Sequence, residues 1–149
     1  MKAIIIDDEN KARRLISTLI IEQCPEITSH LEASDLESGV ALIKEHQPDI
    51  VFLDIEMPKM NGLDTLNTLR EKGNESAIII FSFHSEELLI QRILNEGANG
   101  YISKGVNVED LVVGTLCPKP TLKVLFVVLG GEHHGVHASR DSVVILDGD

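Results

Sequence analysis

The sequence has few cysteines and no long hydrophobic segment, and both shortages narrow the class of protein. Its only two cysteines, Cys24 and Cys117, lie in unrelated contexts without a CxxC pair, so no disulfide framework is expected, which suits a reducing cytoplasm. No apolar run approaches the roughly 18–20 residues of a membrane-spanning helix, and the start MKAIIIDDEN has too short an apolar run for a signal peptide. The sequence therefore predicts a cytoplasmic protein that does not contact a membrane.

Basic residues are also scarce, and this shortage bears on the partners of the chain. The 13 Lys and Arg stand against 24 Asp and Glu, which gives a net charge of −11, and most of this excess lies in residues 1–116. Nucleic-acid binding depends on Lys and Arg that neutralise phosphates. We therefore expect no direct nucleic-acid binding by residues 1–116, whose acidic side chains are better suited to a cation or a basic partner.

Short apolar runs alternate with amphipathic stretches five times in the first 116 residues. Continuous β-branched runs are typical of strands buried on both faces, and apolar residues at three- and four-residue spacing are typical of helices. A capping box at Ser34–Glu37 marks the start of one helix. Strands are expected over 2–7, 27–33, 49–54, 77–81 and 100–103, and helices over 10–23, 34–46, 62–73, 85–96 and 107–116.

Five strand–helix units predict an α/β fold, a doubly wound five-stranded parallel sheet with helices on both faces. In such open sheets, ligands bind at the carboxyl ends of the strands. Three carboxylates that meet there repel one another and need a counter-charge. Mg²⁺ fits this need, because it takes oxygen ligands and keeps several waters. The polar residues at the strand ends are Asp7, Asp8, Asp54, Ser82 and Lys104.

These side chains are suited to accepting a phosphoryl group. Phosphoryl transfer depends mainly on positioning and on neutralising the charge of the equatorial oxygens. A metal ion and Lys104 would neutralise that charge, and Ser82 would donate a hydrogen bond. Asp54 would then be the in-line nucleophile. We interpret this edge of the sheet as a candidate phosphoryl-accepting site.

Four segments at the strand ends resemble the receiver domain of bacterial two-component response regulators: IIIDDE, DIVFLDIEMPKMNG, IIIFS and GANGYISK. The resemblance covers residues 1–116 and implies the (βα)5 receiver fold. It implies that Asp54 is the phospho-acceptor and that Mg²⁺ is bound directly by Asp8 and through water by Asp7. Asp54 and the backbone carbonyl of Glu56 would complete the protein ligands.

The resemblance also implies how such a site signals. Lys104 would pair with the phosphate, Ser82 would move toward it, and the rotamer of Tyr101 would report the switch. A sensor histidine kinase or a phosphotransfer protein would donate the phosphoryl group, and the new conformation would alter binding of a downstream output partner or domain, in transcription or other output control. The chain would then be no enzyme beyond catalysing its own phosphorylation and dephosphorylation.

Three residues beside the acceptor depart from the usual receiver pattern or vary among receivers. Phe83 stands where receivers usually keep a small residue, and its ring is expected to narrow access to Asp54. Glu56 and His84 flank the acceptor, and we hypothesise that they tune the attack of water on the phosphorylated aspartate.

The pattern of apolar and polar residues changes in residues 117–149. CPKP reads as a linker or helix stop, and the apolar runs at 122–129 and 142–146 predict a β-hairpin-like tail or β-pair. This tail has too little core to be an independent domain. It is expected to pack on the receiver, to pair between chains as in a homodimer, or to be a remnant; response regulators normally carry an output domain at this place.

Two other function classes compete with the switch. A haloacid-dehalogenase-type phosphatase also phosphorylates an aspartate after a strand, but it needs a second aspartate two residues on, where this chain has Glu56. A receiver-like binding module that is never phosphorylated is the other alternative. Phe83 favours that module, whereas the complete set of active-site residues favours the switch.

Overall fold

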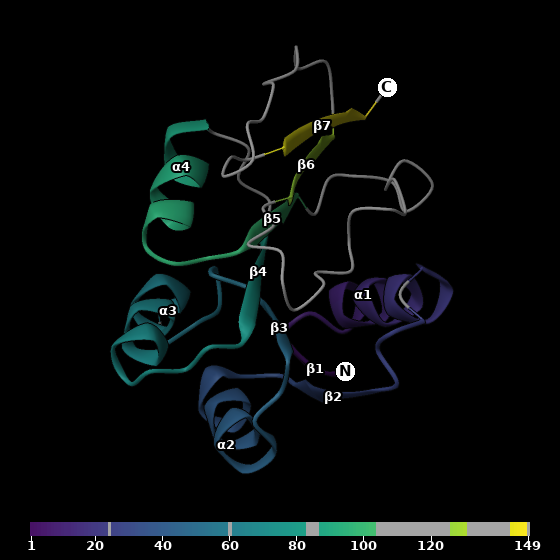
Figure 1. The fold of residues 1–149 in the computed structure, drawn as a ribbon, viewed down its shortest axis with the longest axis vertical. Coiled ribbons are helices and arrows are strands. Elements are labelled where there is room, and N and C mark those ends of the chain that lie inside the picture. Colours follow the sequence, from purple (N-terminus) through teal and green to yellow (C-terminus); the bar gives the residue numbers. More distant parts are fainter. Residues whose placement is uncertain (24, 60, 83–86, 104–125, 131–143, 149) are drawn as a thin grey trace.

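The computed structural model describes residues 1–23, 25–59, 61–82, 87–103, 126–130 and 144–148 of the chain (Figure 1). Strands and helices alternate through the first 103 residues, as predicted. In chain order the elements are β1 (Lys2–Ile6), α1 (Asn10–Gln23), β2 (Ser29–Ala33), α2 (Leu36–His46), β3 (Ile50–Leu53), α3 (Gly62–Glu71), β4 (Ala77–Ser82), α4 (Glu87–Asn95), β5 (Gly100–Ser103), β6 (Phe126–Gly130) and β7 (Val144–Gly148).

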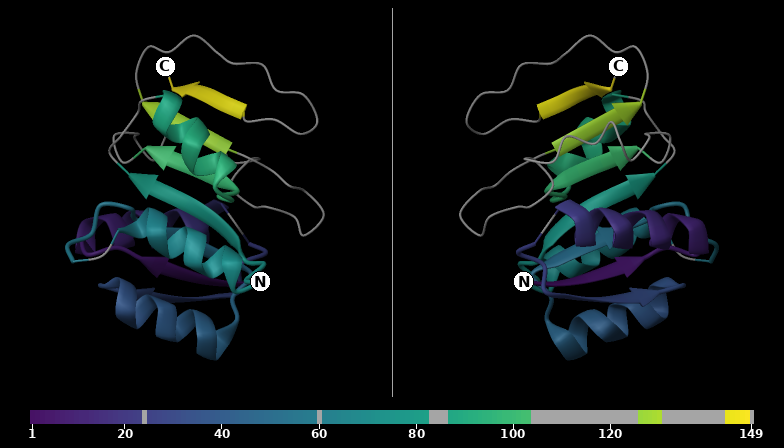
Figure 2. Two further views of the ribbon diagram at one scale, coloured as in Figure 1. Left: turned by 90° about the vertical axis from the view of Figure 1, so that its left-hand side faces the viewer. Right: turned by 90° about the vertical axis from the view of Figure 1, so that its right-hand side faces the viewer.

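The strands form one sheet in the order β2-β1-β3-β4-β5-β6-β7, and every pairing is parallel. Figure 2 shows the strand arrows pointing in the same general direction. The chain passes from β1 to β2 on one side and then to β3 on the other side, so the strand order reverses at β1. Open α/β sheets bind ligands at such a switch point. The predicted parallel receiver sheet is confirmed, while the predicted helix over 107–116 lies outside the described residues.

Helices cover both faces of this sheet. The helix α1 lies on one face, and α2, α3 and α4 lie on the other (Figure 1). Successive side chains of a strand point to opposite faces, and β1 follows this rule: Ile4 and Ile6 pack with the α2–α4 layer, whereas Ala3 and Ile5 pack with α1. Two apolar layers therefore hold the central strands, and the polar residues that follow these strands in the sequence lie at the edge of the sheet.

The N-cap of α2 was predicted one residue too early. The N-cap is Asp35 rather than Ser34, because the Asp35 carboxylate accepts hydrogen bonds from the Ser38 backbone N–H at 2.7 Å and from the Ser38 hydroxyl at 3.0 Å. The Ser38 backbone N–H, followed by its hydroxyl, lowers the pKa of Asp35 from its ordinary 3.8. These hydrogen bonds stabilise the charged form of the aspartate, because the carboxylate is their acceptor.

The tail strands β6 and β7 continue the sheet beyond β5 (Figure 2). Tyr101 in β5 is in register with Val127 in β6, and Val127 is in register with Ile145 in β7. A hairpin would pair its two strands antiparallel, so of the two predicted forms the parallel pair found here is the β-pair and not the hairpin. Both strands run parallel to β5. The spacing of apolar residues along the sequence does not specify this direction.

A half-buried arginine ties together the amino-end side of the sheet, away from the acidic edge. The Arg70 guanidinium donates hydrogen bonds to the backbone carbonyls of Gly97 at 3.0 Å, Asn74 at 2.8 Å and Ser76 at 2.7 Å, and to Asn99 Oδ1 at 2.7 Å. These acceptors precede β4 and β5, and Arg70 lies in the last turn of α3. One side chain therefore links the end of α3 to the turn before β4 and to the segment before β5, which lies 27–29 residues farther along the chain.

Candidate functional site

The candidate site lies at the carboxyl ends of β1 and β3. Ile6 and Leu53 are in register in these neighbouring strands, and the Asp54 N–H donates to the Ile6 carbonyl at 2.9 Å. The next residue of each strand is therefore an aspartate at the same edge. The carboxylate oxygens of Asp7, Asp8 and Asp54 lie within 4.8 Å of one another.

The environments of these aspartates differ. Asp7 and Asp54 are 1% and 2% exposed, whereas Asp8 is exposed to solvent. Two buried carboxylates next to a third concentrate negative charge where water cannot screen it well, so a cation is strongly favoured there. Carboxylate and carbonyl oxygens are the donors that Mg²⁺ takes. This donor set therefore fits the magnesium ion that the sequence predicts.

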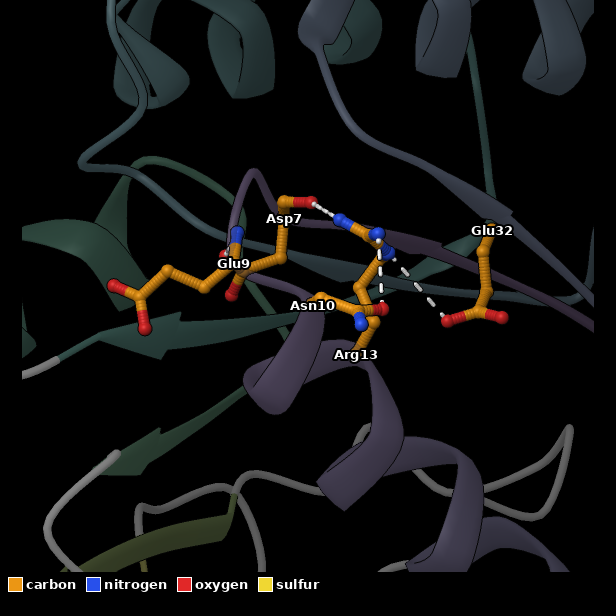
Figure 3. Close-up of polar contacts among 5 residues, drawn as sticks. All are labelled: Asp7, Glu9, Asn10, Arg13 and Glu32. Atoms are coloured by element: carbon orange, nitrogen blue, oxygen red, sulfur yellow. Dashed lines mark hydrogen bonds and ion pairs between the residues drawn. The ribbon is translucent and has the colours of Figure 1, made fainter.

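Three hydrogen bonds hold Asp7 in place. Its N–H donates to the Ala33 carbonyl of β2 at 3.1 Å, and its Oδ1 accepts from the Glu9 N–H at 2.9 Å. Its own carbonyl accepts from the Arg13 guanidinium of α1 at 2.7 Å (Figure 3). The loop after β1 is thus attached both to the neighbouring strand and to the helix that follows.

The loop after β3 holds Asp54 in a similar way. The Glu56 N–H donates to Asp54 Oδ1 at 2.9 Å, which orients the carboxylate. The start of α3 then returns close to this loop: a Cβ at Gly62 would lie 2.5 Å from Ile55 Cα and 2.8 Å from the Asp54 carbonyl oxygen. Only glycine allows this approach, so Gly62 is part of what shapes the loop that carries the acceptor.

Ser82 and Tyr101 lie on the next strands along the sheet. Ser82 is the last residue of β4 and is fully buried, at the same edge as the aspartates. Tyr101 on β5 is also fully buried and packs in the apolar layer beneath α2–α4. The ring therefore faces inward in this structure, which is one of the two positions that the switch interpretation requires.

The other predicted site residues cannot be placed. Lys104, Phe83 and His84 lie outside the described residues, so their expected roles stay predictions. Glu56 is described, and it is exposed. Its backbone is fixed by the contact with Asp54, while the prediction that its side chain tunes dephosphorylation is not tested by this geometry.

Sequence reasoning missed the contact of Arg13 with the acidic loop. Arg13 lies on the first turns of α1, and its Nε forms an ion pair with Glu32 Oε1 of β2 at 3.6 Å. The available signal was weak, since an arginine on an amphipathic helix is usually a solvated residue. The placement of Glu32 just before the end of the strand next to β1 is the one clue that a partner for Arg13 lies near this loop.

This fold and this acidic edge define an α/β domain of the receiver class, with a carboxylate cluster at the carboxyl ends of its strands. The chain belongs to the response regulator receiver domain family, whose model matches residues 3–114. It is 40% identical over 109 residues to the nitrate/nitrite response regulator protein NarL of Escherichia coli K12, covering 73% of this chain and 50% of that protein. It is 34% identical over 112 residues to the DNA-binding transcriptional activator EvgA of the same strain, covering 75% of this chain and 54% of that protein.

Solved structures agree with this assignment. A chain of the CheX–CheY–BeF3–Mg²⁺ complex from Borrelia burgdorferi is 29% identical with a TM-score of 0.64, and the match covers 73% of this chain and 81% of that one. The present chain spans about half the length of the curated relatives NarL and EvgA. These two relatives are regulators rather than metabolic enzymes. Within the described residues, no helix combines the length and the apolar character needed to cross a bilayer.

Proposed function

We propose that this receiver domain is a phosphorylation-dependent switch in which Asp54 accepts a phosphoryl group from a sensor histidine kinase or a phosphotransfer protein. The observation that carries the proposal is the cluster of three carboxylates within 4.8 Å at the switch point of the sheet. Asp54 is the buried member that directly follows β3 and whose carboxylate is oriented by the Glu56 N–H. Membership of the receiver family supports this assignment.

The same residues are the proposed magnesium ligands. Asp7, Asp8, Asp54 and the backbone carbonyl of Glu56 would hold Mg²⁺, and the presence of Mg²⁺ in the related complex with BeF3 supports a magnesium site by analogy. When bound, the ion would offset negative charge on the phosphoryl oxygens. Asp7 has little freedom to move away, because its backbone is tied to β2 and to α1.

The transfer itself is a single in-line substitution. A carboxylate oxygen of Asp54 attacks the phosphorus of the donor's phosphohistidine, a P–O bond forms, and the P–N bond breaks with its electron pair going to the histidine nitrogen. Lys104 would pair with the phosphoryl oxygens, and Ser82 would donate a hydrogen bond to one of them. Glu56 and His84 would then tune the attack of water that returns Asp54 to the free carboxylate.

The readout is a repacking of the face around β4 and β5. Attraction of Ser82 toward the phosphoryl group would open space beside the buried ring of Tyr101, and the two would move together to change the affinity for a partner. We propose that the output is transcriptional control, because EvgA is named a DNA-binding transcriptional activator. Residues 117–149 would extend the receiver formed by residues 1–116 or pair between two chains.

Intact-mass spectrometry after incubation with acetyl phosphate tests this function. The wild-type chain should gain one phosphoryl group only when Mg²⁺ is present, and Asp54→Asn should gain none. Asp64→Asn is the matched control, because it removes the same charge from an exposed position on α3. It should behave like the wild type.

Other results would separate the proposal from its alternatives. An adduct that persists in Asp54→Asn would place the acceptor elsewhere. A wild type that gains no phosphoryl group would point to Phe83 if Phe83→Ala gains one, and to a binding module that is not phosphorylated if it does not. A phosphatase of the haloacid-dehalogenase type would instead turn over acetyl phosphate repeatedly without a lasting adduct.

A further inference from the structure

Arg13 makes polar contacts with three residues around the first loop of the acidic edge. Its Nη1 donates to the Asp7 carbonyl oxygen at 2.7 Å, and its Nη2 donates to Asn10 Oδ1 at 3.3 Å. Its Nε is 3.6 Å from Glu32 Oε1. Figure 3 shows the guanidinium between the loop after β1 and the end of β2. The side chain of Arg13 is only 16% exposed, so this is a defined position rather than a solvated surface charge.

The contact with Asp7 acts on the peptide group that leads into Asp8. The Asp7 carbonyl belongs to the peptide bond between these two aspartates, so its orientation determines the direction in which the chain enters Asp8. Asp8 is exposed, and among the described residues the structure shows no hydrogen bond from another group to its carboxylate. Within the described residues, the backbone at the Asp7–Asp8 peptide is therefore the constraint on where this carboxylate lies.

The charge of Arg13 has the opposite effect on a cation. A guanidinium close to the acidic cluster repels Mg²⁺, and removing it would by electrostatics alone tighten cation binding. Glu32 reduces this repulsion by forming the ion pair, although its own side chain is 42% exposed and the pair is partly screened. The geometric and electrostatic effects of Arg13 thus predict changes of opposite sign.

We propose that Arg13 is a positioning residue for the cation site, which orients the Asp7–Asp8 peptide and so raises Mg²⁺ affinity despite its positive charge. The inference rests on the proposed function, because it assumes that the acidic edge binds Mg²⁺. Groups that orient metal ligands typically contribute 10- to 100-fold in metal affinity. The planar guanidinium of Arg13 suits this role, because it contacts the Asp7 carbonyl and the Glu32 carboxylate at the same time.

The test is a calorimetric Mg²⁺ titration of the unphosphorylated chain. Arg13→Gln should weaken binding about 10-fold, even though it removes a charge that repels the ion. Arg14→Gln is the matched control: it removes the same charge from the exposed neighbouring residue, and its affinity should equal or slightly exceed that of the wild type. Thermal unfolding curves would establish that each variant is fully folded at the temperature of the titration.

Arg13→Lys keeps the charge but loses the planar fork, and it should weaken binding several-fold. This variant carries the test if Arg13→Gln does not fold. If either folded variant binds Mg²⁺ as tightly as the wild type, or more tightly, Arg13 acts only as a nearby charge and the inference is wrong. A wild-type chain that takes up no Mg²⁺ would instead overturn the cation site, and the role of Arg13 with it.

Discussion

At the scale of single residues, Asp35 shows how a fully exposed carboxylate can still affect stability. Its pKa is lowered first by the Ser38 backbone N–H, then by the Ser38 hydroxyl, and in smaller part by the attraction of Lys59. A group whose folded pKa is depressed stabilises the folded state above its unfolded pKa, and this contribution is lost as the pH falls through the folded pKa. The charged cap of α2 should therefore support the fold at neutral pH and cease to do so in acid.

Asp35→Asn tests this dependence, because asparagine can cap a helix without carrying a charge. Urea unfolding should show the wild type more stable than the variant at neutral pH. The difference should shrink as the pH is lowered through 3.8, the ordinary pKa of the group, and below it. Other carboxylates titrate equally in both proteins and cancel. A difference that stays constant across this range would mean that the charge of Asp35 does not stabilise α2.

The residues of the acidic edge could be named from the sequence, whereas the contacts that hold them could not. Asp7, Asp8 and Asp54 each follow a continuous apolar run, and parallel strands bring such positions to one edge. The bond from Arg13 to the Asp7 carbonyl depends on how α1 packs across the sheet and on the position of β2. Neither follows from the spacing of residues along the chain.

At the scale of elements, the sequence predicted strands better than their surroundings. Strands β1, β3 and β4 are almost fully buried, and their unbroken apolar runs made them easy to recognise. The edge strand β2 is mostly exposed and gave a weaker pattern. The cap of α2 was misplaced by one residue, since several polar residues precede this helix and only the three-dimensional turn shows which one accepts the hydrogen bond.

The junction between the acceptor loop and α3 depends on one glycine, and Gly62→Ala should disturb both stability and function. The added Cβ would meet backbone at 2.5 Å and 2.8 Å, so the loop that carries Asp54 must move. Overpacking of this kind costs about 1–3 kcal/mol. Urea unfolding should show this loss, and phosphorylation of Asp54 by acetyl phosphate should slow in the folded variant.

Gly73→Ala separates backbone strain from displacement of the loop. Gly73 has a φ of +79°, so alanine is strained there by roughly 1–2 kcal/mol, but nothing lies within 4 Å of the added Cβ. This control should lose stability and keep the phosphorylation rate of the wild type. If Gly62→Ala also keeps that rate, the close approach of α3 does not position Asp54.

At the scale of the whole molecule, Arg70 joins segments that the sheet alone would leave separate. Burial lowers the pKa of its guanidinium, which stays charged at neutral pH, and all four of its acceptors are neutral oxygens. Arg70→Lys should destabilise the domain by about 2 kcal/mol, because one ammonium cannot satisfy four acceptors spread over two segments, residues 74–76 and 97–99. Urea unfolding would measure this loss.

Arg92→Lys provides the comparison for Arg70→Lys on a neighbouring helix. Arg92 is 68% exposed and pairs with Glu96 at 3.2 Å, four residues along α4. Its replacement should cost less than about 0.5 kcal/mol. Equal losses in the two variants would show that the buried contacts of Arg70 add nothing beyond an ordinary surface pair.

The reversal of strand order at β1 also has a consequence for synthesis of the protein. The ribosome releases Asp7 and Asp8 long before Asp54, since two helices and β2 separate them in the chain. While β1 has only β2 beside it, the two earlier aspartates would lie without the Asp54 carboxylate beside them. The concentrated negative charge arises when β3 inserts on the other side of β1. The repulsion between the three carboxylates therefore arises only after the first strand–helix units have been made, and the packing of those units can compensate for it.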